Sequence, residues 1–193
     1  MTHAMAWLAV TPAAGLRTPF PTADFRCFSR FHLGLPLTQV DEPEGPRCSS
    51  PMETSGHHLV CCPRNGIVQR HGAVQDVFLR AAKQAGFVAR REQAPPDRTR
   101  PGDVFIARLD ANGPAAVDIT VRHTLAPSRP LRAAGDVAPW HETQEKEKVV
   151  KYLGQCRRLG CSMVPFVQDC FGGFGTEARS LETSFLRLLL GQN

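Results

Sequence analysis

The sequence lacks any apolar run approaching the roughly 18–20 residues that a membrane-spanning helix requires. Its first ten residues are mildly apolar, but no basic segment precedes them and no clear cleavage site follows, so we do not expect a secretory signal. Internal repeats and low-complexity tracts are also absent. With 42% hydrophobic and 21% charged residues, the 193-residue chain has the composition of a globular protein with one ordinary domain and a small appendage.

Several common catalytic motifs are missing as well. No Ser/His/Asp set has a recognisable spacing, and no paired-aspartate motif of the polymerase type is present. The glycine-rich segment 172–175 precedes a predicted helix but has no Lys-Ser/Thr after it, so we interpret it as a turn and not as a phosphate-binding loop.

Charge and cysteine content leave two questions open. The net charge of +5 fits a polyanionic partner and fits a solvated basic surface equally well. The seven cysteines are an odd number without a secretory context, which favours reduced thiols in an intracellular protein over a disulfide framework. Some of these thiols could bind a metal ion.

The pattern of apolar residues divides the chain into a loosely ordered lead-in over 1–44, a Cys/His-rich segment over 45–64 and an α/β domain over 65–193. In this domain the predicted helices cover 67–85, 141–159 and the segment after 176, and the predicted strands cover 87–90, 103–109, 115–123 and 162–170. We expect Thr176 to cap the last helix. The apolar stripe of the second helix is expected to consist of Val149, Val150, Leu153 and Cys156. The strand–helix–strand crossover between 115 and 170 predicts parallel neighbours and a mixed sheet flanked by helices.

Two acidic residues stand out in the predicted sheet. Asp103 opens one strand and Asp118 lies within the next, between Val117 and Ile119. A carboxylate in so apolar a stretch is costly unless it is paired or bound to metal. Two carboxylates on adjacent strands could hold Mg²⁺ (or Mn²⁺) against a phosphate. Alternatively, Asp118 lies on the wet face of a half-exposed sheet and Asp103 only begins a strand.

The order of short motifs resembles the PD-(D/E)XK, or restriction-endonuclease-like, superfamily. More closely, it is similar to the nuclease-like domain near the C-terminus of some reverse-transcriptase-bearing mobile-element (retrotransposon) proteins. The similarity covers roughly residues 28–175. The motifs that carry it are Gly56-His57-His58, Arg70-His71, Arg100-Pro101-Gly102-Asp103, Asp118-Ile119-Thr120, Lys148-Val149-Val150-Lys151-Tyr152 and Val164-Pro165-Phe166-Val167. The resemblance implies a four-stranded core of order α-β-β-β-α-β-α and Mg²⁺-dependent DNA cleavage, with Asp103 and Asp118 as metal ligands.

One departure from that pattern concerns the lysine usually found two residues after the second acid. Thr120 occupies its position, with a hydroxyl but no charge. Lys148 and Lys151, one turn apart on the following helix, could supply the missing cation, and Arg122 shares a strand face with Asp118. Both lysines could equally belong to a solvated helix face. The predicted nucleic-acid contacts are Arg98, Arg100, Arg122, Lys148 and Lys151.

The Cys/His-rich segment has half of a zinc site. His58 and Cys62 have the spacing of a ligand pair, as do His57 and Cys61, but the partner expected three residues before Cys48 would be Gly45. The segment is therefore either a structural zinc knuckle built from three or four of these ligands, or a decayed one whose cysteines fill small apolar spaces.

From the sequence we expect a metal-dependent endonuclease that acts on DNA, with no membrane association. The alternative is a catalytically inactive remnant of the same fold that binds nucleic acid through its basic residues.

Overall fold

A computed structural model describes residues 67–92, 101–110, 113–122 and 137–191, together with 26–27, 29–31, 33, 35–37, 54, 56, 58 and 62. The chain divides into two compact units. One comprises residues 1–67, 123–130 and 170–173, and the other comprises 68–122, 131–169 and 174–193. In the first unit the rings of Phe31 and Phe171 stack with their centroids 5.2 Å apart. The second unit contains the sheet.

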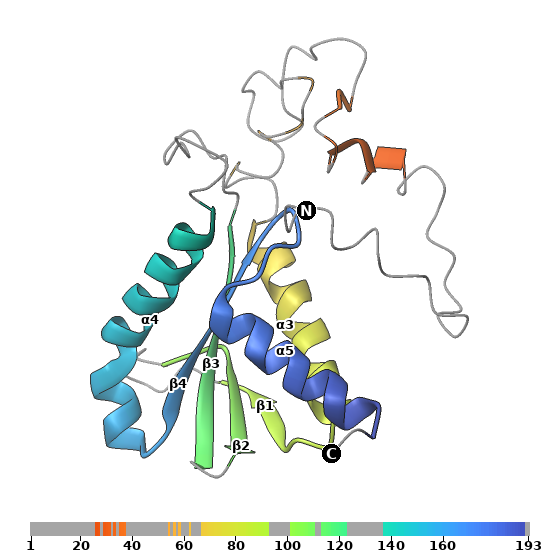
Figure 1. The fold of residues 1–193 in the computed structure, drawn as a ribbon. Helices are drawn as coiled ribbons and strands as arrows, with labels where there is room; N and C mark the ends of the chain where they lie inside the picture. Colours follow the sequence, from red (N-terminus) through yellow and green to blue (C-terminus); the bar gives the residue numbers. More distant parts are fainter. Residues whose placement is uncertain are drawn as a thin grey trace. The chain divides into compact units, whose positions relative to one another are not determined.

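The elements follow the predicted order of a helix, three strands, a helix, a strand and a helix (Figure 1). Their bounds are α3 (Ile67–Gln84), β1 (Ala89–Arg91), β2 (Val104–Asp110), β3 (Gly113–Arg122), α4 (Val137–Leu159), β4 (Ser162–Asp169) and α5 (Thr176–Leu189). None of the helices in the described part of the chain is long and apolar enough to span a membrane.

The four strands form one mixed sheet in the order β1-β2-β3-β4. The first three pair antiparallel, and β2 and β3 are joined by a two-residue connection of the kind that antiparallel strands allow. β4 pairs parallel to β3, as the intervening helix requires. The predicted mixed α/β class with a four-stranded sheet is therefore confirmed.

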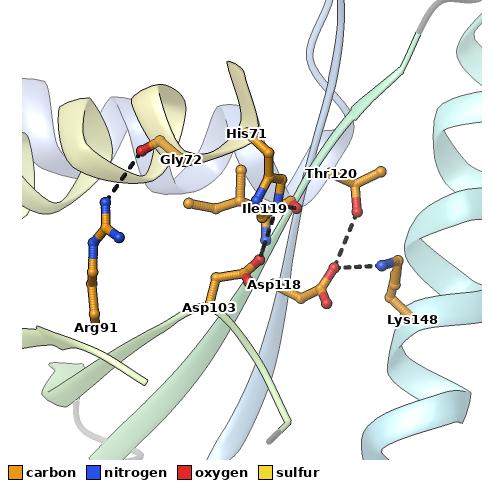
Figure 2. A network of polar contacts seen from close by, with 8 residues as sticks. All are labelled: His71, Gly72, Arg91, Asp103, Asp118, Ile119, Thr120 and Lys148. Atoms are coloured by element: carbon orange, nitrogen blue, oxygen red, sulfur yellow. Dashed lines mark hydrogen bonds and ion pairs between the residues drawn. The ribbon is translucent and has the colours of Figure 1, made fainter. Parts of the chain in front are cut away.

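Strand alternation gives the sheet two different faces. Val117 and Ile119 of β3 and Phe166 of β4 lie on the face covered by α3 and α5. Phe78 of α3 lies between Phe166 and Phe185 of α5, with ring centroids 5.1 and 5.4 Å away. Burial of these side chains drives the assembly of the sheet with α3 and α5. Asp118, Thr120 and Arg122 alternate to the opposite face, as predicted, and α4 lies on that face, where Lys148 contacts Asp118 (Figure 2).

The predicted apolar stripe of α4 is wrong in part. Val150 is 75% exposed and Leu153 is 41% exposed, and of the four predicted positions only Cys156 is fully buried. The side of the helix that faces the sheet carries mainly polar residues at spacings of three and four, namely His141, Gln144, Glu145 and Lys148. Polar groups at β3 and β4 pair with this side, and those pairs set the rotation of the helix.

The cap of α5 also differs from the prediction. Gly175 occupies the N-cap position and makes no side-chain hydrogen bond, and Thr176 is the first helical residue. The carboxylate of Glu145, on α4, takes the place of a local cap and accepts the N–H of Glu177 at 3.0 Å. Burial of Glu145 raises the pKa of its carboxyl, although hydrogen bonds from the first amides of α5 act in the opposite direction.

Candidate functional site

Asp103 is fixed beside β3 by its backbone and its side chain together. Its N–H donates to the carbonyl of Val117 at 2.7 Å, and its Oδ2 accepts the N–H of Ile119 at 2.8 Å. These two partners are the residues immediately before and after Asp118. The first predicted acid therefore lies next to the second, although they are fifteen residues apart in sequence.

The carboxylate of Asp118 has its own partners on the α4 side of the sheet (Figure 2). Lys148 Nζ lies 2.7 Å from Asp118 Oδ2, and the Thr120 hydroxyl donates to the same oxygen at 3.1 Å. The Asp118 side chain is 8% exposed and that of Lys148 is 22% exposed, so the ion pair is largely withdrawn from water. Charge compensation of this kind offsets the cost of burying a carboxylate.

A histidine from α3 completes the surroundings of Asp103. His71 Nε2 lies 2.8 Å from the carbonyl oxygen of Ile119 and 3.4 Å from Asp103 Oδ2 (Figure 2). A carbonyl only accepts hydrogen bonds, so Nε2 carries the proton. The two acids thus contact different partners. Asp103 contacts groups on β3 and α3, and Asp118 contacts groups on β3 and α4.

The second predicted lysine, Lys151, is exposed one turn along α4. Its Nζ lies 4.7 Å from the centroid of the Tyr152 ring. A hydrogen bond to the Tyr152 side chain raises the pKa of Lys151, and the negative charge of Asp118 adds to the effect. Lys151 is therefore a firmly charged cation within the electrostatic range of the acid. Arg122, at the end of β3, is exposed on the same strand face as Asp118.

A second buried polar pair lies at the far end of β4. His141 of α4 and Asp169 of β4 are each about 6% exposed or less, with Nε2 and Oδ2 separated by 3.4 Å. With Lys148 and Asp118, this gives α4 two charged or polar attachments to the sheet.

Several predicted site residues fall outside the described residues: the zinc ligands Cys48, His57 and Cys61, and the nucleic-acid contacts Arg98 and Arg100. Of the Cys/His-rich segment, His58 and Cys62 are described. The N–H of Cys62 donates to the carbonyl of His58 at 2.8 Å, and Cys62 is buried and not in a disulfide. Among the described residues, no group of three or more His, Cys, Asp or Glu side chains is arranged to hold a metal ion.

Sequence reasoning missed some contributors to this region. His71 belongs to the Arg70-His71 motif, but the motif does not indicate that its ring lies beside Asp103. A helical position gives no indication of which strand carbonyl the side chain will reach. The signals for His71 are the Arg70-His71 motif and its place on the first helix, ahead of the acidic pair.

Gly102 allows Asp103 to approach β3 closely. A Cβ at this position would lie 2.7 Å from the carbonyl oxygen of Val117 and 2.9 Å from its carbonyl carbon. Because both atoms belong to the backbone of a central strand, they cannot move aside without disturbing the sheet.

We therefore expect Gly102→Ala to destabilise the protein by about 2 kcal/mol, as for overpacked core positions, and to displace Asp103. For a chain of this length, that is a fall in the melting temperature of about 4–8 °C. The matched control is Gly154→Ala within α4, where the nearest side-chain atom is 3.9 Å away and where helix propensity favours alanine. Equal melting temperatures for the two variants would contradict the prediction.

Compared with protein-family models and with curated proteins, the chain matches none of them.

Proposed function

We propose that the second unit is a metal-dependent endonuclease domain of the restriction-endonuclease-like class, which hydrolyses phosphodiester bonds in DNA. The order α3-β1-β2-β3-α4-β4-α5 and the mixed sheet are compatible with that class. The observation that carries the proposal is the bonding of Asp103 to both neighbours of Asp118 on β3, with Lys148 in contact with Asp118.

The donor atoms near the two acids fit a hard divalent cation. Asp103 and Asp118 offer carboxylate oxygens, which Mg²⁺ prefers, and one or two protein carboxylates are enough because the ion retains waters and binds a phosphate oxygen. Both known contacts of Asp118 fall on Oδ2. When bound between these acids, Mg²⁺ would polarise the phosphate and lower the pKa of an attacking water.

Lys148 supplies the cation that Thr120 does not. Its ammonium group donates to Asp118 before a substrate arrives, and a phosphate oxygen bound beside Asp118 would offer it a second acceptor. Thr120 holds the carboxylate through its hydroxyl and so restricts its rotation. The side chain two residues after the acid therefore orients that acid, and the positive charge comes from α4.

The ion pair also gives the alternative its main support. An ammonium group 2.7 Å from Asp118 neutralises the carboxylate that a metal ion would need. A remnant of the fold that binds nucleic acid without cutting it would be stable in this arrangement, because Lys148 then substitutes permanently for the metal.

The test is incubation of the full chain with supercoiled plasmid. We expect conversion to the nicked form in Mg²⁺ or Mn²⁺ and none with excess EDTA, because the carboxylates alone cannot activate water at neutral pH. Asp118→Asn, purified identically, controls for a contaminating nuclease. DNA binding without nicking in either metal would favour the inactive, nucleic-acid-binding remnant. Absence of both DNA binding and nicking would contradict the proposal.

A further inference from the structure

Adjacent arginines on the edge strand β1 point to opposite faces of the sheet. Ala89 is buried in register with Ile106, on the side of α3 and α5. Arg91, two residues later, shares that side and pairs with Asp76 of α3. Arg90 therefore alternates to the other side, which is the side of Asp118. Its guanidinium lies 5.1 Å from the centroid of the Phe105 ring on β2.

The pairing register relates Arg90 to the acidic pair. Arg90 is in register with Phe105, and Phe105 with Ala116, which lies two residues before Asp118 on β3. With strands about 4.8 Å apart and a rise of about 3.3 Å per residue, Arg90 lies about 12 Å from Asp118, measured between Cα atoms. At about 3.4 Å of helix axis per nucleotide, the spacing is a few nucleotides along one strand of DNA.

The basic groups on this face lie on both sides of the acids. Arg90 is exposed at the β1 edge, and Lys148 and Lys151 project from α4 beyond β3. α4 rests on β4, and of the described helices none covers β1 or β2 on this side. Contact with the face of Phe105 fixes the plane of the guanidinium while its N–H edge can still donate, the arrangement in which arginine binds phosphate best.

We propose that Arg90, held over Phe105, binds a DNA backbone phosphate a few nucleotides from the phosphate at Asp118, so that the β1–β2 half of this face, which none of the described helices covers, is the DNA-binding surface. The assignment rests on the proposed function for its orientation, because it takes Asp118 as the centre of the site. The ligand chemistry is the phosphodiester backbone, and the contact is independent of base sequence.

The two arginines provide a matched test. Arg90→Ala and Arg91→Ala remove the same charge from the same strand, on opposite faces. Binding of a fluorescent DNA duplex to the full chain in EDTA is measured by anisotropy over a range of KCl concentrations. We expect Arg90→Ala to weaken binding about five- to tenfold at low salt and to reduce the slope of log K against log[KCl] by about one. Arg91→Ala should behave as wild type.

The outcomes separate this inference from the endonuclease proposal. Equal binding by the two variants, with nicking intact, overturns the role of Arg90 and leaves the endonuclease standing. If the slope of log K against log[KCl] depends on Arg90 but the chain never nicks DNA, the result supports the DNA-binding surface and overturns the endonuclease proposal. Absence of DNA binding by the wild type overturns both, and binding of an RNA duplex alone overturns the choice of DNA. Arg90→Lys keeps the charge and should recover part of the affinity, which excludes misfolding as the cause.

Discussion

Asp118→Asn is expected to lower the rate of plasmid nicking about 100-fold or more in Mg²⁺, while the affinity for DNA in EDTA stays the same or rises. Loss of even an outer partner of a metal ligand typically costs about 10- to 100-fold in metal affinity or activity, and Asp118 is proposed as a direct ligand. The amide keeps the shape of the side chain and can still accept from Thr120, so the change is confined to the charge. Removal of a negative charge cannot weaken attraction to a polyanion.

The control for this variant is Asp76→Asn. Asp76 is also an aspartate beside the sheet, but it lies on α3 in an exposed pair with Arg91. Exposed pairs contribute about 0–1 kcal/mol, so this substitution should leave both the melting temperature and nicking almost unchanged. Equal loss of activity in both variants would show that Asp118 has no special role.

Lys148→Met is expected to destabilise the chain by about 2 kcal/mol in the absence of divalent metal. Removal of one partner from a buried ion pair leaves an uncompensated charge, which costs about 3–5 kcal/mol when both groups are fully buried. The 22% exposure of Lys148 allows water to compensate part of that charge. The melting temperature should fall by about 4–8 °C. In the double variant Asp118→Asn/Lys148→Met, most of this loss should be recovered, because neither charge remains.

Lys148→Met also distinguishes a metal site at Asp118 from a carboxylate that Lys148 neutralises permanently. If Asp118 binds Mg²⁺, millimolar Mg²⁺ should raise the melting temperature of Lys148→Met more than that of the wild type, since the ion then replaces the missing ammonium. The same melting-temperature measurement can be made in parallel with Ca²⁺ in place of Mg²⁺. A Mg²⁺ effect of equal size in the wild type, the single variant and the double variant would show that the ion does not bind at Asp118.

Much of the sheet could be predicted from local pattern. The alternation of Val117, Ile119 and Val121 with Asp118 and Thr120 predicts a strand with one apolar and one polar face, and β3 has these faces. The helix predicted between two predicted strands indicates that these strands are parallel, and β3 and β4 do pair parallel. The helix α4 begins at Val137, four residues before the predicted start at 141, because proline is tolerated in the first turn of a helix and Pro139 does not interrupt it.

The orientation of α4 and the contacts of the acids could not be predicted in this way. Apolar periodicity assumes that a helix turns its hydrophobic residues inward, whereas α4 turns its polar residues toward Asp118 and Asp169. The sequence pattern offers Lys148 and Lys151 as candidates for the cation that Thr120 does not supply. Only the packing of α4 on β4 determines that Lys148 is the one that reaches Asp118. Similarly, His71 is 32 residues from Asp103, and no local pattern links them.

The polar attachment of α4 has a consequence for how the fold responds to its surroundings. The face formed by α3 and α5 is held mainly by hydrocarbon and aromatic contacts, with His71 and the exposed Asp76–Arg91 pair as polar additions. The α4 face is held by ion pairs, histidine and a buried carboxyl group that also anchors the start of α5. High salt or a competing divalent ion should therefore loosen α4 while the opposite layer remains packed. Substitution of hydrocarbon side chains for these polar groups would strengthen the domain and remove the chemistry that it holds.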